Sequence, residues 1–141
     1  MSFISFLLRI YTNFWRQICY NKDSKFKEKV GEQILLILER LDDMGKPYLV
    51  ANTFHAYIEG TIDYELFLRL ASTIDRSFFP DLMAFKSSTD YNRLPSHTKL
   101  NLTSSGVLDL SAMPSIRMTA NNNKYEVTDL GKTLLKVAFK T

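Results

Sequence analysis

The strongest constraint on the fold is a stretch of helical periodicity between Phe26 and Pro80. Apolar residues recur there every three or four positions, which is the spacing of one face of an α-helix. Gly45, Gly60 and Pro80 divide the stretch, because each is typical of a helix end. Pro47 suits the first turn of the helix after Gly45, where its missing N–H is not needed. The pattern predicts three antiparallel helices with short links, which form a compact bundle.

The three expected helices each have a core-facing apolar stripe. The first spans residues 26–44, the second runs from Pro47 to Glu59, and the third begins after Asp63, whose side chain is suited to cap a helix N-terminus. The inward side chains that the spacing predicts are Val30, Ile34, Leu35, Ile37, Leu38, Leu41 and Met44, then Leu49, Val50, Phe54, Tyr57 and Ile58, then Leu66, Phe67, Leu70, Ala71, Ile74 and Phe78.

A second helix-forming segment, Phe3–Tyr20, has twelve apolar or aromatic residues, two arginines and no Gly or Pro. It predicts an amphipathic helix with a wide apolar face. Arg9 interrupts the apolar run well before the roughly 18–20 residues that a transmembrane span requires, and no cleavage site follows. Two interpretations stay open: the apolar face is buried against protein, including a second copy, or it lies in a membrane interface. The candidate interface or membrane residues are Phe3, Leu7, Ile10, Phe14, Trp15 and Ile18.

Charge is segregated along the 141 residues, although the net value is only +3. Residues 1–29 hold six basic and two acidic side chains, residues 30–85 hold four and nine, and residues 86–141 hold eight and four. Two basic ends therefore surround an acidic centre. Because basic surfaces attract anionic partners, we expect nucleic acid, a nucleotide, acidic protein or anionic lipid to bind at the ends.

Several kinds of site are not expected from the residue types present. The single Cys excludes an intrachain disulfide and a multi-Cys zinc site, and it fits a reducing, cytoplasmic setting. The segment Gly60–Asp63 is interpreted as a helix connector, because the residues around it supply too few carboxylates for a calcium loop. His55 has no partner at a recognised catalytic spacing, so it is interpreted as a partly buried polar residue. We therefore expect no enzyme activity, no metal and no cofactor.

The polar residues after Phe85 predict a loop or a short irregular helix, followed by a helix near residues 97–105 that Gly106 ends. A brief strand and two further strands, at 115–120 and 124–128, are expected next, with a turn at Asn121–Asn123. Thr128 or Asp129 is expected to cap a final helix with its lysines outward. The last third thus predicts a helix, a hairpin and a helix.

This order, with Gly106-Val107 after the first helix and Tyr125-Glu126-Val127-Thr128-Asp129-Leu130-Gly131 after the hairpin, resembles the second half of bacterial winged-helix domains. The resemblance implies that residues 97–105 are a recognition helix, with Thr103 and Ser104 among its contacts. That helix has only one Lys, so phosphate binding would be weak and a scaffold for protein contacts is an equal alternative. The candidate residues for an anionic partner are Arg93, His97, Lys99, Asn101, Arg117 and Lys124.

The centre and end, from FKEKVGEQILLILERLDDM through YIEGTIDYELFLRLASTIDRSFFPDL to KYEVTDLGKTLL, are also similar to a set of small bacterial and phage-borne proteins of uncharacterised function. This resemblance implies a non-catalytic sensing or docking module, in some cases in antiviral defence or counter-defence. It carries no site residues.

Together these observations predict a mainly helical α+β protein: an amphipathic helix and basic linker at 1–25, then one domain at 26–141 with a three-helix bundle and a winged-helix-like end. The expected function is a non-enzymatic interaction or regulatory module, cytoplasmic or peripheral to the inner membrane. It would form a homo-oligomer or dock on a protein through its N-terminal helix, and it would bind a protein or an anionic ligand through a basic C-terminal face. The alternatives are a winged-helix DNA-binding regulator and a peripheral membrane effector that senses a nucleotide.

Overall fold

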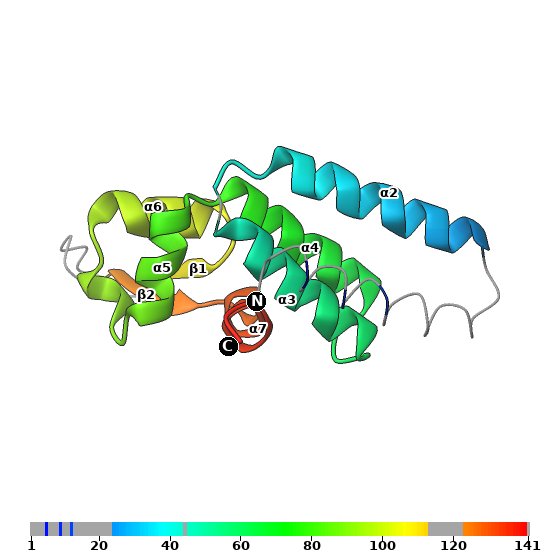
Figure 1. The fold of residues 1–141 in the computed structure, drawn as a ribbon. Helices are drawn as coiled ribbons and strands as arrows, with labels where there is room; N and C mark the ends of the chain where they lie inside the picture. The colour runs from blue at the N-terminus through cyan, green and yellow to red at the C-terminus, as the bar shows by residue number, and fades with distance from the viewer. Residues whose placement is uncertain are drawn as a thin grey trace. The chain divides into compact units, whose positions relative to one another are not determined.

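The computed structural model describes residues 5, 9, 12, 24–43, 45–112 and 123–140. This part of the chain is mainly helical with one two-stranded sheet (Figure 1), so the expected α+β, mainly helical class is confirmed. The chain divides into two compact units, Met1–Asp75 and Arg76–Thr141, and each is described by itself. The sequence placed a boundary after residue 25 instead, and the expectation of one domain over residues 26–141 stays a prediction.

The first unit contains the helices α2 (Ser24–Arg40), α3 (Lys46–Ile58) and α4 (Tyr64–Arg76), whose last residue begins the second unit. The three lie side by side, as expected for a bundle (Figure 1). α2 ends at Arg40, earlier than predicted. The Asp43 carboxylate accepts a hydrogen bond from the Gly45 N–H at 2.7 Å, and such local side-chain bonds compete with helix continuation.

The link between α2 and α3 is longer than predicted, and Gly45, expected to end the first helix, is instead the N-cap of α3, whereas the link between α3 and α4 follows the prediction. Pro47 lies in the first turn of α3, as expected. Gly60 has φ +77°, a left-handed conformation that side chains with a Cβ rarely adopt, and it lies directly after α3. The Asp63 carboxylate then accepts a hydrogen bond from the Leu66 N–H at 2.8 Å, which confirms Asp63 as the cap of α4.

An aromatic cluster occupies the contact between α3 and α4. Phe54 and Tyr57 on α3 meet Tyr64 and Phe67 on α4, with ring centroids 5.5–5.9 Å apart. Phe67 is fully buried. Rings at these separations pack favourably edge-to-face or offset, so this cluster supplies much of the apolar contact of the unit. Further predicted inward residues that are buried are Val30, Leu49, Val50, Leu70, Ala71 and Ile74.

Two predicted core residues are in fact exposed. Leu35 is 63% exposed, because the apolar run Ile34–Leu38 passes around more of the helix circumference than one packing face can cover. Phe78 is 61% exposed, because α4 ends at Arg76 and the helical phase that placed Phe78 inward stops there. Met44 lies outside the described residues.

The second unit contains α5 (Phe79–Ser87), the 3-10 turn η1 (Tyr91–Arg93), α6 (Ser96–Ser104), β1 (Leu108–Ala112), β2 (Asn123–Val127) and α7 (Asp129–Val137). α5 was missed from sequence. Pro80 was interpreted as the end of the preceding helix, whereas it occupies the first turn of a new one, where proline is equally at home. The predicted helix near 97–105 is confirmed as α6.

The sheet is an antiparallel pair with a register from Leu108 opposite Val127 to Ala112 opposite Asn123. The strand predicted at 124–128 is therefore present as β2, and the brief strand after Gly106 is its partner. Residues 113–122, with the predicted strand 115–120, lie outside the described part of the chain. Asn123, predicted as a turn residue, begins β2 instead, because it pairs with Ala112.

Thr128 joins three elements of the second unit. Its Oγ1 lies 2.6 Å from the Gly106 carbonyl oxygen, to which it donates, and it accepts from the Gly131 N–H at 3.0 Å as the N-cap of α7. Gly106 has φ +86° and ends α6, as predicted. Gly131 allows close packing, because a Cβ there would lie 2.4 Å from the Val107 carbonyl oxygen. The end of α6 and the start of α7 are thus fixed together.

Candidate functional site

The first predicted site, on Phe3–Tyr20, falls almost entirely outside the described residues. Within that segment the structure describes Ser5, Arg9 and Thr12, each helical and exposed. All three belong to the sector that the sequence predicts to be polar. The candidate interface or membrane residues Phe3, Leu7, Ile10, Phe14, Trp15 and Ile18 are outside the described residues, as is Arg117 of the second set.

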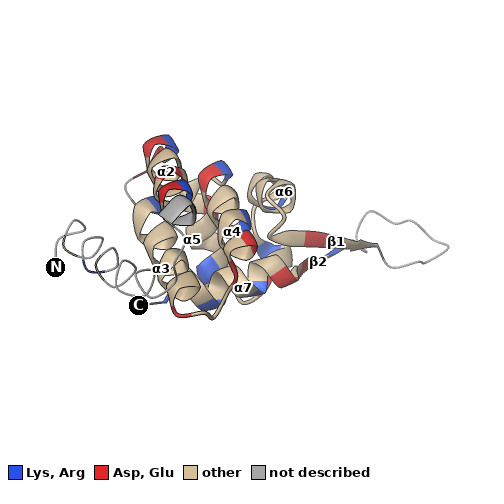
Figure 2. Cartoon of the chain, turned by 90° about the vertical axis from the view of Figure 1, so that its right-hand side faces the viewer, with Lys and Arg blue, Asp and Glu red and all other residues tan. Residues whose placement is uncertain are grey.

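The second predicted site centres on α6, which is almost uncharged (Figure 2). Its Lys99 points to β2: Nζ lies 5.0 Å from the centre of the Tyr125 ring and donates to the Asn92 carbonyl oxygen at 3.2 Å. The Asn92 side chain accepts from the Tyr125 N–H at 2.9 Å. The structure therefore brings η1, α6 and β2 together around Lys99.

Two other basic candidates are near carboxylates. The Arg93 guanidinium lies 3.4 Å from Asp90, and the Lys124 ammonium lies 3.6 Å from Glu126. All four side chains are largely exposed, so these pairs contribute little to stability. They do reduce the positive potential that Arg93 and Lys124 present to an anionic partner. His97 is exposed on the first turn of α6.

Asp81 fixes α6 from beneath, and the sequence did not single it out. Asp81 is only 4% exposed. One oxygen accepts from the Thr98 hydroxyl at 2.8 Å and the other accepts from the Asn101 amide at 2.9 Å. Asn101, a predicted ligand residue, is therefore partly engaged inside the protein, and its amide group is held in one orientation. Such a buried carboxylate requires these hydrogen bonds to offset its desolvation.

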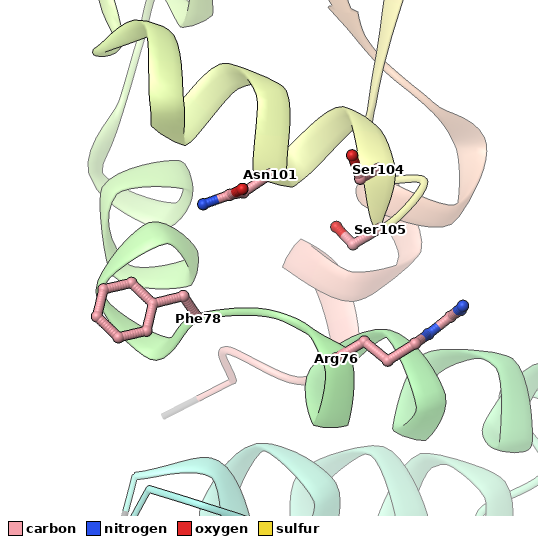
Figure 3. Close-up of a pocket in the computed structure, with 5 residues that line it drawn as sticks. All are labelled: Arg76, Phe78, Asn101, Ser104 and Ser105. Atoms are coloured by element: carbon pink, nitrogen blue, oxygen red, sulfur yellow. The ribbon is translucent and has the colours of Figure 1, made fainter.

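A cavity of about 330 Å³ opens beside this anchor and lies within the second unit. It is lined by Arg76, Phe78, Asn101, Ser104 and Ser105. Figure 3 shows the Phe78 ring and the Asn101 amide at one end and the Arg76 guanidinium directed toward the other. The lining therefore combines a cation, an aromatic ring, an amide and two hydroxyls.

Sequence reasoning found two of these five positions, Asn101 and Ser104, both as contacts of a recognition helix. It missed Arg76, Phe78 and Ser105. Phe78 was assigned to the core by its spacing, and only the proline two residues later could have indicated that a new helix begins there. Nothing in the sequence placed the end of α4 beside α6.

A polar cluster around Lys46 joins two helices of the first unit. Lys46 is 1% exposed, and its Nζ donates to the Asp42 carboxylate at 2.5 Å and to the Asp75 carbonyl oxygen at 2.9 Å. The hydrogen bond from Lys46 lowers the pKa of Asp42 below its ordinary value of 3.8, against a smaller desolvation effect. Arg40 pairs with the Asp75 carboxylate at 3.0 Å. Lys46 thereby ties the start of α3 to the end of α4.

Among the described residues, no helix is both long and apolar enough to cross a membrane. The same residues contain no group of three or more His, Cys, Asp or Glu side chains placed to hold a metal ion. Comparisons with protein-family models, curated proteins and solved structures found no match to this chain.

Proposed function

We propose that this chain is a non-enzymatic interaction module of bacterial or phage origin, in which α6 is the docking surface for a protein partner and Phe3–Tyr20 mediates self-association. In this proposal the second unit is a winged-helix-like module: α6 takes the place of a recognition helix, and the β1–β2 pair takes the place of the wing. A role in antiviral defence or counter-defence is part of the same proposal.

The observation that carries the proposal is the composition of the outer face of α6. Leu100 is 65% exposed on that face, with His97 and Asn101 beside it, while Thr98 and Leu102 on the other face are buried. This arrangement matches the apolar centre and polar rim of a protein–protein interface. A surface that binds a phosphate backbone would instead present several unpaired cations.

The docking surface is tested with a photo-crosslinking amino acid placed at Leu100 of the full chain, expressed in its native host. We expect one discrete, heavier protein adduct. The matched control places the same group at Lys136, an exposed position on α7, where no such adduct should form. Adducts with nucleic acid at position 100, or equal adducts at both positions, would contradict the proposal.

Self-association is tested by sedimentation velocity of the full chain across a range of concentrations. The wild-type protein should be larger than a monomer, and Phe14→Asp with Trp15→Asp should shift it toward the monomer, because both changes remove apolar area from the predicted face. A monomeric wild-type protein at all concentrations would refute this half of the proposal. Co-sedimentation with anionic lipid vesicles that the same double substitution abolishes would favour the peripheral membrane effector.

A second candidate, the winged-helix DNA-binding regulator, is favoured by the charge of the second unit. Residues 76–141 hold nine basic and five acidic side chains, and α6 is followed by a hairpin and a helix. Electrophoretic mobility with random duplex DNA separates the candidates. A shift that persists at moderate salt and weakens in Lys99→Gln would support DNA binding, whereas no shift at low salt would remove it.

A further inference from the structure

The cavity beside α6 has features of a ligand site, and Asn101 is the one lining residue that the docking proposal also names. Its volume of about 330 Å³ is at the lower end of the range typical of small-molecule pockets. Its five lining residues come from the end of α4, the link to α5 and the last turn of α6. All five belong to one compact unit, so the cavity does not require a second unit or a second chain.

The amide of Asn101 is held in a fixed orientation at one end of the cavity. One of its two N–H groups donates to the Asp81 carboxylate at 2.9 Å, and Asp81 is itself held by the Thr98 hydroxyl at 2.8 Å. The amide oxygen and the second N–H are left as an acceptor and a donor for a ligand. An aromatic base carries the complementary acceptor and donor on its edge, which is how Asn recognises bases in nucleic-acid complexes.

The Phe78 ring lies near Asn101 in the cavity (Figure 3) and is 61% exposed. An exposed phenylalanine beside a base-reading amide offers a flat apolar surface on which a base stacks. The Ser104 hydroxyl donates to the Leu100 carbonyl oxygen at 2.9 Å, so it meets a ligand as an acceptor. A sugar hydroxyl is the matching donor.

Charge determines which end of the cavity accepts an anion. Arg76 supplies the one cation among the lining residues that the structure describes, and its guanidinium is directed away from Phe78 (Figure 3). The buried Asp81 carboxylate lies behind Asn101 and repels an anion from that end. A single phosphate therefore belongs at Arg76, whose planar guanidinium matches phosphate geometry. Further phosphates would lack a cation of their own in the lining.

We infer that this cavity binds a nucleoside monophosphate, with the base on Phe78 and Asn101, the sugar near Ser104 and the phosphate on Arg76. The inference goes beyond the proposed function, since it adds a small ligand to a module that docks on protein through the neighbouring face of α6. A free nucleotide and one nucleotide of a single strand share this chemistry.

Calorimetric titration of the full chain tests the site, with AMP, adenosine, inorganic phosphate and a single-stranded oligo-dA as separate probes. AMP should bind about tenfold or more tightly than adenosine or phosphate, because only AMP engages both ends of the cavity. Phe78→Ala and Arg76→Gln should each weaken AMP binding about tenfold, and Phe78→Tyr should retain it because the ring is kept. Arg76→Gln should leave adenosine binding unchanged.

The matched controls are Arg69→Gln, an exposed arginine on α4 outside the cavity, and Leu110→Ala, an exposed apolar residue on β1. Neither should change AMP binding. Tighter binding of oligo-dA that also falls in Phe78→Ala and Arg76→Gln would support the site and assign its nucleotide to a strand. Equal affinity for AMP and phosphate, equal loss in Arg69→Gln and Arg76→Gln, or no saturable AMP binding at millimolar concentration would overturn the inference. A loss of the photo-adduct at position 100 with intact AMP binding would instead affect only the docking proposal.

Discussion

Apolar side chains are buried in both units, and the second unit adds several hydrogen bonds between side chains of distant segments. In the first unit, helices meet through apolar side chains, and the ring centroids of Phe54 and Phe67 are 5.5 Å apart. In the second, polar side chains make specific bonds between distant segments, such as Thr98 with Asp81 at 2.8 Å and Thr128 with Gly106 at 2.6 Å. Apolar contacts are not directional, whereas these hydrogen bonds are. The stability of the first unit should therefore depend most on buried side-chain volume. The stability of the second should depend more on the geometry of its hydrogen bonds and close contacts.

The largest expected effect is in the first unit. Phe67→Ala removes a fully buried ring from the aromatic cluster and should lower the free energy of unfolding by about 3–5 kcal/mol. Chemical denaturation measures the loss, and hydrogen exchange should show it first at the amides of α3 and α4. The exposed Phe78→Ala is the control and should change stability by less than about 0.5 kcal/mol. Equal effects would show that the cluster is not the core of the unit.

A pair of glycine substitutions compares the geometry of the two units directly. Gly131→Ala places a Cβ 2.4 Å from the Val107 carbonyl oxygen and should destabilise the protein by about 1–3 kcal/mol. Gly31→Ala, in the middle of α2 with nothing within 4 Å of its Cβ, should stabilise it by about 0.5–1 kcal/mol. Thermal denaturation of both variants measures the signs. A stabilising Gly131→Ala would mean that α7 moves away from Val107 without cost.

A smaller loss of stability is expected where the end of α6 meets the start of α7. Thr128→Ala removes the N-cap of α7 and the bond to the Gly106 carbonyl, and should cost about 1 kcal/mol. Thr128→Ser keeps the hydroxyl and should recover most of the loss in a urea titration. If Ser is no better than Ala, packing of the Thr methyl group and not the hydroxyl holds the junction.

The smallest effect is electrostatic and depends on pH. The pKa of Asp42 is lowered in the folded state, chiefly by its hydrogen bond from Lys46. The stabilisation is therefore fully present above the unfolded value near 3.8 and is lost as the pH falls through the lower, folded pKa. Asp42→Asn should flatten this part of the acid unfolding curve relative to the wild type. Asp43→Asn, the neighbouring carboxylate, is the control for a general change of charge.

Helix positions were predictable in the first unit because helical periodicity is a local property of the sequence. Gly60 and Asp63 mark the link between α3 and α4, and both act as their residue types suggest. The exposure of Leu35 was not predictable, since a run of apolar residues does not show which of them another helix will cover. α5 was missed because Pro80 ends one helix or begins the next with equal ease.

The candidate site was predictable only in part, because local sequence patterns do not show which distant segments come into contact. The spacing identified α6 and placed Lys99 and Asn101 on it. It could not show that Asp81, twenty positions before Asn101, fixes the amide, or that Arg76 shares the cavity. These contacts depend on how distant segments fold onto one another, and no local pattern encodes them.

The Asn92 side chain hinders the addition of a third strand to this small sheet. It accepts the Tyr125 N–H at 2.9 Å, a group on the side of β2 that faces away from β1. An exposed strand edge is a template on which another chain can add a strand, and a side chain that occupies its donor blocks that addition. Asn92 is in turn held by Asp90, which accepts from its backbone N–H at 3.1 Å. η1 thus covers this edge of β2. A peptide that paired with β2 there would first have to displace the Asn92 side chain.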